Sequence, residues 1–286
     1  MRVGILTFGR KHGRKTGTIG SSILRGHWLQ EHWEGSELWT EGRKFDAILF
    51  QKVYWKEYFD VYDGVKILDL CDPDWLGPDL QLREISDKVD AITCSSKGIY
   101  EYVKKIVNVP IYFIPDRVNF NFFNEPKQHI GKAETVVWFG YYHNAKVVLP
   151  QVLPSLKRLG LKLLVISNEA YDPMTDYGVD IESRPFDWQT LKWDITFGDM
   201  LINPQPIEGK FVYKSDNKTF IGQALGMPVA QTADDMKRFL DPDERNKEAA
   251  EKLEVLHRDF DVKKSVEEFK SIIENIYAKR GSQDKG

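Results

Sequence analysis

The segment 211–230, FVYKSDNKTFIGQALGMPVA, decides how the rest of the chain is interpreted. A polar start at 214–218 is followed by small and apolar residues that predict a helix over 219–225. Gly226 suits the left-handed position just after a helix, and Pro228 cannot continue one. The segment therefore predicts a loop, a helix, a turn and then a strand at 229–230.

The start of this predicted helix is a candidate anion site. A helix N-terminus gathers unpaired N–H groups and partial positive charge. Lys214 and Lys218 add two formal charges beside it, and such a combination suits a phosphate or diphosphate. The same residues also fit an ordinary solvated helix cap. The segment alone leaves both interpretations open.

The composition indicates a globular protein. A length of 286 residues is enough for one large or two modest domains, and 42% hydrophobic with 13% aromatic residues argues against disorder. The net charge of −3 gives no overall attraction to nucleic acid. Cys71 and Cys94 are too few for a disulfide framework and predict buried thiols in a reducing compartment. Without a leader-like start or a long apolar run, we expect a soluble, cytoplasmic protein with no stable membrane insertion.

Near-continuous apolar runs predict parallel strands that are covered on both faces. In the first half of the chain they are 3–8, 47–50, 66–70, 91–94 and 111–114. Polar residues follow the runs, at the strand ends where α/β sheets bind ligands. A glycine-containing basic loop and a predicted helix at 19–33 follow the first run. Because the loop does not match G-x-G-x-x-G, an NAD site is not predicted.

The strand–glycine–helix pattern begins again in the middle of the chain. A run at 135–139 ends in Gly140 and is followed by a predicted helix at 147–159. Further strands are predicted at 161–166, 180–186 and 200–204, with a short helix at 188–193. Residues 253–276 carry apolar side chains at helical spacing. The repetition predicts two similar Rossmann-like halves.

Three passages carry a family resemblance. The segments KSDNKT (214–219) with ALGMPV (224–229), IPDRVNFNFF (114–123) and FGYYHN (139–144) resemble GT-B glycosyltransferases, in particular a bacterial and phage subgroup related to the retaining family 4. Two glutamates of the family motif fall at Tyr213 and Ile221 in this sequence. The resemblance therefore implies that another residue contacts the donor ribose, and Asn217 is the candidate.

The resemblance implies an α/β fold of the GT-B type, with two Rossmann-like domains whose parallel sheets face an interdomain cleft. The expected divisions are an acceptor-side domain at 1–123, a donor-side domain at 124–260, and a C-terminal helix at 261–286 that packs back on the first domain. The expected substrate is a nucleotide-diphosphate sugar, linked to UDP or GDP, and no further cofactor is implied.

The resemblance also implies site residues. The candidate donor-binding residues are Gly17, Thr18, Gly20, Gly140, His143, Asn144, Phe186, Ser215, Asn217, Lys218 and Thr219. The candidate catalytic residues are Asp72, Arg117 and Lys218. Lys218, Ser215, Thr219 and Arg117 are expected to stabilise the charge that develops on the leaving diphosphate, which pre-placed cations and N–H groups can do without a metal ion. Asp72 is expected to contact the sugar or the acceptor.

Several of these residues have simpler explanations. Asp72 also fits a structural turn before Pro73, and its neighbours Asp69 and Asp74 suggest a metal site that Pro73 interrupts. Arg117 could instead pair with Asp116 at the surface. A loop histidine such as His143 more often has a structural role than a catalytic one. These alternatives stay open at the level of sequence.

The predicted reaction is transfer of a hexose to an acceptor hydroxyl, with retention at the anomeric carbon. The acceptor is left open between a glycan and a modified nucleobase in nucleic acid. Two alternatives share the fold: a nucleotide-sugar epimerase, which needs acid and base carboxylates, and a catalytically silent nucleotide-sugar binding module.

Overall fold

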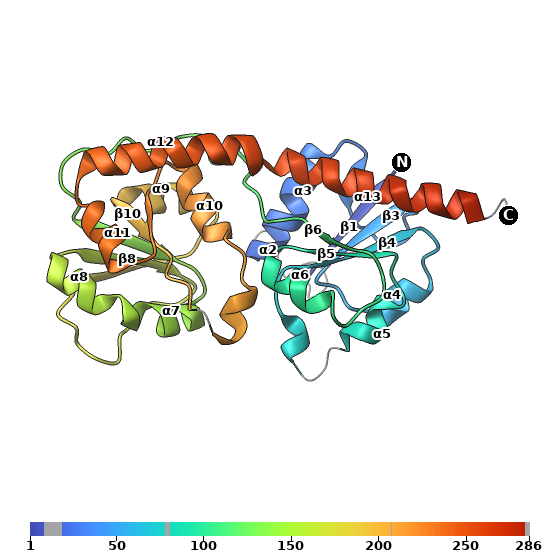
Figure 1. The fold of residues 1–286 in the computed structure, drawn as a ribbon, viewed down its shortest axis with the longest axis horizontal. Coiled ribbons are helices and arrows are strands. Elements are labelled where there is room, and N and C mark those ends of the chain that lie inside the picture. The colour runs from blue at the N-terminus through green and yellow to red at the C-terminus, as the bar shows by residue number, and fades with distance from the viewer. Residues whose placement is uncertain (9–18, 78–80, 207, 284–286) are drawn as a thin grey trace. The chain divides into compact units, whose positions relative to one another are not determined.

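The computed structural model describes residues 1–8, 19–77, 81–206 and 208–283 (Figure 1). Its contacts divide the chain into two compact units. Unit 1 consists of Met1–Asn119, Gly209–Asp216 and Phe260–Gly286, and unit 2 of Phe120–Glu208 and Asn217–Asp259. Residues 209–216 therefore group with the N-terminal unit, whereas the sequence-based boundaries place them within 124–260.

Unit 1 is built on a six-stranded parallel sheet of order β2-β1-β3-β4-β5-β6. The strands are β1 (Val3–Thr7), β2 (Ser36–Leu38), β3 (Ala47–Gln51), β4 (Val65–Leu70), β5 (Ala91–Cys94) and β6 (Ile111–Phe113). β1, β3 and β5 are buried along their whole length, because helices cover both faces of a parallel sheet. The five strands predicted in this half are confirmed. β2 was not predicted, since it is a three-residue edge strand whose side chains are only half-buried.

The helical elements of unit 1 are α2 (Gly20–Ser22), η1 (Ile23–His27), α3 (Trp28–His32), α4 (Lys56–Asp60), η2 (Asp74–Leu76), α5 (Leu82–Ser86), α6 (Lys97–Val103), η4 (Gly209–Tyr213) and α13 (Val262–Gln283). The helix predicted at 19–33 is present, but its middle part, η1, is a π-helix. Such wider turns are rare and occur often at functional sites. α13 packs against α3 and reaches β4 (Figure 1).

The core of unit 1 explains the two cysteines. Phe50 and Phe59 make an edge-to-face contact, with their ring centroids 4.7 Å apart, within the apolar core cluster of unit 1. Cys94 belongs to this cluster, and Cys71 lies buried just after β4. Burial raises the pKa of both thiols well above the ordinary range. Both cysteines are therefore the buried, free thiols that the sequence predicts.

Unit 2 is built on a five-stranded parallel sheet of order β11-β10-β7-β8-β9. The strands are β7 (Thr135–Phe139), β8 (Lys162–Ser167), β9 (Ile181–Pro185), β10 (Met200–Ile202) and β11 (Val229–Ala230). From β7 the chain builds outward through β8 and β9, and it then returns to the other side of β7 with β10. The carboxyl ends of β7 and β10 are therefore the point at which the strand order reverses, where open α/β sheets bind ligands.

The helices of unit 2 are α7 (Tyr142–Val148), η3 (Leu149–Gln151), α8 (Leu153–Leu159), α9 (Leu191–Phe197), α10 (Asn217–Ala224), α11 (Ala233–Arg238) and α12 (Pro242–Asp259). The helix predicted at 188–193 begins later, as α9. The N–H of Gln189 donates to the side chain of Asp187, so residues 188–190 form a turn before the helix.

α10 ends as the sequence predicts. Gly226 has a φ of +71°, in the left-handed region. Its N–H donates to the carbonyl of Gln223, and the N–H of Met227 donates to the carbonyl of Gly222. This pair of bonds is the Schellman arrangement that closes a helix. The turn leads the chain directly into β11.

Candidate functional site

The reversal point of the unit 2 sheet brings a strand end and a helix start together. Asn203 directly follows β10, and its side-chain amide donates to the hydroxyl of Thr219 at 3.0 Å. Its backbone N–H donates to the carbonyl of Ala230 in β11, and its side chain is buried. Asn203 thus fixes the first turn of α10 to the carboxyl edge of the sheet.

Lys218, in the same turn of α10, lies over the end of β7. Its ammonium nitrogen is 4.5 Å from the centre of the Trp138 ring and 6.0 Å from that of Phe139. Gly140, just after β7, has a φ of +151°, and a Cβ atom there would lie 2.4 Å from the ammonium nitrogen. The ammonium therefore occupies space that only a glycine leaves open.

The remaining donor candidates of unit 2 lie at strand ends and helix starts. His143 and Asn144 are in the first turn of α7, where His143 is exposed and the N–H of Asn144 donates to the carbonyl of Tyr141. Phe186 follows β9, and its N–H donates to the carbonyl of Ser167. Asn217 is the first residue of α10 and is half-buried. Of the predicted donor residues, the structure brings Gly140, Lys218 and Thr219 into one group.

The other predicted donor residues lie elsewhere. Gly17 and Thr18 fall outside the described residues, and Gly20 begins α2 in unit 1. Ser215 also belongs to unit 1. Ile221, at one of the two positions where the family motif has a glutamate, is buried in unit 2. An apolar side chain in that place has no group with which to bind a ribose.

The segment Gly209–Asp216 is anchored on α6. The hydroxyl of Ser96 donates to the carbonyl of Tyr213 at 2.7 Å, and the Tyr213 ring lies edge-on to Trp75, with centroids 5.5 Å apart. A Cβ atom at Gly98 would come within 2.1 Å of the carbonyl oxygen of Val212. Gly98 therefore allows the two backbones to approach, and this contact places Lys214 and Ser215 in unit 1.

A pocket of about 330 Å³ lies beside this segment. Its lining residues are Lys52, Asp72, Pro73, Asp74, Leu76, Lys210 and Lys214, and we call it the lysine–aspartate pocket. Among these residues, Asp72 has one carboxylate oxygen 2.6 Å from the ammonium of Lys52 and the other 2.5 Å from that of Lys214. The predicted catalytic residue Asp72 is thus held between two lysines.

The charges in this pocket are mutually stabilised. Burial by itself raises the pKa of Asp72, but the ammonium groups of Lys52 and Lys214 lower it below its ordinary value. Burial likewise lowers the pKa of Lys52, while its acidic neighbours, Asp72 among them, raise it by more. At neutral pH Asp72 is therefore a carboxylate and a weak base, better suited to hold lysines in place than to take a proton.

Asp72→Asn is expected to reduce the free energy of unfolding at pH 7 by about 1 to 2 kcal/mol, because Lys52 loses a charged partner. A depressed carboxyl pKa gives stability that is present above the ordinary value of about 3.9 and is lost as the pH falls through the lowered value. Urea unfolding should therefore show the difference between wild type and variant shrinking below about pH 4. Asp63→Asn, at an exposed position of unit 1, is the control. An Asp72→Asn difference that is as large at pH 3 as at pH 7 would contradict this account.

The chain resembles known proteins in its structure but not in its sequence. No protein-family model matches the chain, and no curated protein matches it. Among solved structures, a glycosyltransferase from Rickettsia africae matches with a TM-score of 0.65 and 10% identity, over 96% of this chain and 98% of that one. HepE from Anabaena, in complex with UDP-glucose, matches with a TM-score of 0.58 and 10% identity, over 99% and 100%. TarM matches with a TM-score of 0.61 and 9% identity, over 86% of this chain and 57% of TarM.

The fold is GT-B. The fold class that the family resemblance implied is therefore confirmed. The chain spans little more than half the length of TarM but nearly the whole of the other two GT-B proteins. At these identities the similarity is one of fold, so any function has to be argued from the residues of this chain.

The sequence analysis did not single out a buried network of charges in unit 1 of this GT-B protein. Arg25, in the π-helix η1, donates to both carboxylate oxygens of Asp69, at 2.7 and 2.6 Å. It also donates to Asp116 at 3.1 Å and to the carbonyl of Ile114 at 3.0 Å. Arg25 is 3% exposed and Asp69 is fully buried. An arginine on the apolar side of the predicted helix, next to Leu24 and close to Trp28 and Leu29, was the available signal for this network.

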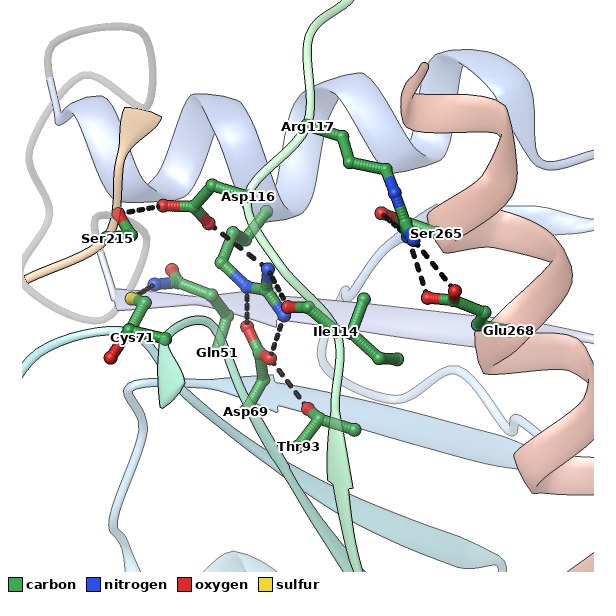
Figure 2. Close-up of polar contacts among 12 residues, drawn as sticks. Gln51, Asp69, Cys71, Thr93, Ile114, Asp116, Arg117, Ser215, Ser265 and Glu268 are labelled. Carbon is green, nitrogen blue, oxygen red and sulfur yellow. Dashed lines mark hydrogen bonds and ion pairs between the residues drawn. The ribbon is translucent and has the colours of Figure 1, made fainter. Parts of the chain in front are cut away.

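The network extends to the segment that carries Lys214. Figure 2 shows this chain of contacts: Ser215 bonds to Asp116, Asp116 and Asp69 both bind the Arg25 guanidinium, and Thr93 bonds to Asp69. The hydroxyl of Ser215 donates to Asp116 at 2.5 Å. Burial raises the pKa of Asp116, and the bonds from Arg25 and Ser215 offset this only in part. Ser215, predicted to bind the donor, thus holds its own segment to the carboxyl edge of the unit 1 sheet.

Arg117 is bound to α13. Its guanidinium donates to both carboxylate oxygens of Glu268, at 2.7 Å each, and to the hydroxyl of Ser265 at 2.9 Å (Figure 2). Its side chain is only 6% exposed. A bidentate pair of this kind fixes direction as well as distance. In this structure Arg117 therefore ties the chain after β6 to the C-terminal helix of unit 1.

Two further observations concern ions and membranes. Within the described residues, no group of three or more His, Cys, Asp and Glu side chains is arranged to hold a metal ion. The described helices also include none with both the length and the apolarity to cross a bilayer.

Proposed function

We propose that this chain is a glycosyltransferase whose unit 2 binds the diphosphate of a nucleotide sugar at the start of α10. The observation that carries the proposal is the position of Lys218, held over the end of β7 beside Gly140. Asn203 and Thr219 hold the same turn of α10 against the sheet. A cation and a helix N-terminus at the reversal point of a parallel sheet form a site for a diphosphate.

The proposed chemistry follows from the charge on the leaving group. As the bond between the sugar and the diphosphate breaks, negative charge develops on the departing phosphate oxygen. The Lys218 ammonium and the N–H groups at the start of α10 stabilise the transition state, which carries this charge, more strongly than they stabilise the bound substrate. A lysine placed in this way supplies the positive charge without a metal ion. A bond forms between the sugar and the acceptor oxygen as the bond to the diphosphate breaks, and the proton of the acceptor hydroxyl passes to the departing phosphate oxygen. The family resemblance favours a hexose and retention at the anomeric carbon.

UDP is the first nucleotide to test. HepE, which shares the fold over its whole length, was crystallised with UDP-glucose. In this proposal Asn217, Phe186, His143 and Asn144 contact the sugar or the nucleoside, because they lie at strand ends and helix starts of the same unit. Asp72 positions lysines in unit 1 and does not act as a base.

A thermal-shift panel of UDP, GDP, ADP, CDP and TDP tests the proposal. A ligand at 100 times its Kd should raise the free energy of unfolding by about 2.7 kcal/mol. Lys218→Met is expected to weaken the effective nucleotide at least tenfold, since a hydrogen bond to a charged group is worth about 1.5 to 3 kcal/mol. Lys237→Met removes the same charge from an exposed position of unit 2 and should leave the shift unchanged.

Two outcomes would reject the proposal. No stabilisation by any nucleotide would rule out donor binding, and equal stabilisation of wild type and Lys218→Met would remove Lys218 from the site. Product analysis with the effective nucleotide sugar then separates the functions. Sugar transfer or donor hydrolysis identifies a transferase, a C2 epimer identifies an epimerase, and an unchanged donor identifies a silent binding module.

A further inference from the structure

The lysine–aspartate pocket of unit 1 has a ligand chemistry of its own. We propose that it binds the phosphate and hydroxyl groups of a small phosphorylated sugar or polyol, and that this molecule is the sugar acceptor. The first part rests on the pocket alone, and the second part rests on the proposed transferase function. All the residues that define the pocket belong to unit 1.

The balance of charge favours an anion. The pocket has three ammonium groups and two carboxylates, and the Asp72 carboxylate is bound by Lys52 on one oxygen and Lys214 on the other. Lys52 is 11% exposed and also lies 3.5 Å from Asp74. An ammonium group has three donors, and Lys214 uses one of them on Asp72. Lys214 and the exposed Lys210 therefore present donors and positive charge to a ligand.

The carboxylates suit the hydroxyl groups of the same ligand. Asp74 accepts the hydroxyl of Tyr54 at 2.7 Å and is about one third exposed. A carboxylate has about four lone-pair positions, so Asp72 and Asp74 keep acceptor capacity after these bonds. A pocket with ammonium donors on one segment and carboxylate acceptors on another matches a molecule that carries both phosphate and hydroxyls. Its volume of about 330 Å³ suits a small ligand.

The backbone at Lys52 shows that the pocket is built rather than incidental. Lys52 has a φ of +52°, and among the described residues no other side-chain-bearing residue has a positive φ. That conformation is unfavourable for a residue with a Cβ atom, and a glycine would adopt it freely. What glycine cannot supply is the ammonium, which binds Asp72 and lies 5.1 Å from the centre of the Phe8 ring. Strain of this kind is typical of functional sites.

A small acceptor fits these observations better than nucleic acid does. The chain has a net charge of −3, and the pocket lining combines its lysines with two aspartates. The phosphates of a polyanion would be repelled by these carboxylates. A ligand with a single phosphate can bind it to Lys210 and Lys214, while the hydroxyl groups of the same ligand donate to Asp72 and Asp74. Binding of an oligonucleotide is therefore the competing outcome in the test.

The test is isothermal titration calorimetry of the full chain without nucleotide. The probes are glucose 6-phosphate, glucose, inorganic phosphate and a short single-stranded DNA. We expect glucose 6-phosphate to bind at least tenfold more tightly than glucose or inorganic phosphate. Lys210→Met and Lys214→Met should each weaken it about tenfold, as loss of a charge-assisted hydrogen bond predicts. Lys105→Met, at an exposed position just after α6, removes the same charge and should have no effect.

Lys210→Met keeps the test informative if Lys214→Met disturbs folding, because Lys210 is exposed and outside the ion pairs of Asp72. Glucose 6-phosphate binding no more tightly than glucose, or equally well to both variants, would overturn the proposal. Tighter binding of the DNA that is lost in the same variants would assign the pocket to nucleic acid instead.

The proposed nucleotide site of unit 2 and the proposed acceptor pocket of unit 1 can be disproved independently of each other. Lys218→Met should leave glucose 6-phosphate binding intact, since Lys218 belongs to unit 2. A chain that binds glucose 6-phosphate through Lys210 and Lys214 but no nucleotide would keep the pocket and lose the transferase function. A chain that binds nucleotide through Lys218 but not glucose 6-phosphate would keep the transferase and lose this acceptor.

Discussion

Arg25→Met is expected to lower the free energy of unfolding by about 3 to 5 kcal/mol, the usual cost of removing one partner from a buried ion pair. Asp69 is fully buried and Asp116 nearly so, and both depend on the Arg25 guanidinium. Burial lowers the pKa of Arg25, but the two carboxylates raise it by more, so the guanidinium is fully charged in the folded state. Without it, two carboxyl groups lose their positive partner in the interior. Urea unfolding at pH 7 measures the loss.

Two variants make this result specific. Asp69→Asn added to Arg25→Met removes one unpaired charge and keeps an acceptor for the Thr93 hydroxyl, so part of the stability should return. Arg184→Met removes an arginine that is 26% exposed and pairs with Glu182, 54% exposed, and Asp194, 16% exposed, and should cost about 1 kcal/mol or less. Equal losses for Arg25→Met and Arg184→Met would contradict a central role for the buried network.

The consequences of Arg25→Met should extend to Ser215. Ser215 bonds to Asp116, and Asp116 bonds to Arg25. The segment Gly209–Asp216 carries Lys214 into the lysine–aspartate pocket. A disturbed Asp116 therefore loosens one of the attachments that place Lys214.

Gly140→Ala is expected to affect both stability and nucleotide binding. The φ of +151° at Gly140 is unfavourable for alanine, which should cost about 1 to 3 kcal/mol. The new Cβ atom would also lie 2.4 Å from the Lys218 ammonium nitrogen and 3.0 Å from the buried Trp138 ring. The flexible end of Lys218 has to move, because the indole cannot. We therefore expect at least a tenfold loss of affinity for the effective nucleotide.

Gly160→Ala is the control that distinguishes backbone strain at a positive φ from displacement of the Lys218 side chain. Gly160 follows α8 in the same unit with a φ of +67°, and a Cβ atom there would meet nothing within 4 Å. It should cost about 1 kcal/mol through the backbone alone and leave nucleotide binding unchanged. Urea unfolding and the nucleotide thermal shift measure the two effects. Unchanged binding in Gly140→Ala would show that the Lys218 position does not depend on the glycine.

Most of the fold could be predicted because its signals are local. The central strands are continuous apolar runs, and the Gly-Met-Pro stop after α10 is encoded in three adjacent residues. Two features escaped prediction for physical reasons. β2 is too short and too exposed to show a run, and a π-helix of five residues is too brief to change the apolar period of the helix around it.

The apolar runs and glycines of the sequence were enough to predict two Rossmann-like halves, and the family resemblance implied the GT-B fold and pointed to Gly140, Lys218, Thr219 and Asp72. The contacts of these residues depend on the folded structure. Asp72 meets Lys214 across 142 positions of the chain, and Arg25 meets Asp69 across 44. The hydrophobic periodicity of a sequence depends on residues that are close together in the chain. The ion pairs form between residues far apart in the chain, where the topology brings strand ends together. For that reason the separation of Lys214 and Lys218 into two units could not be seen in a motif where they stand four residues apart.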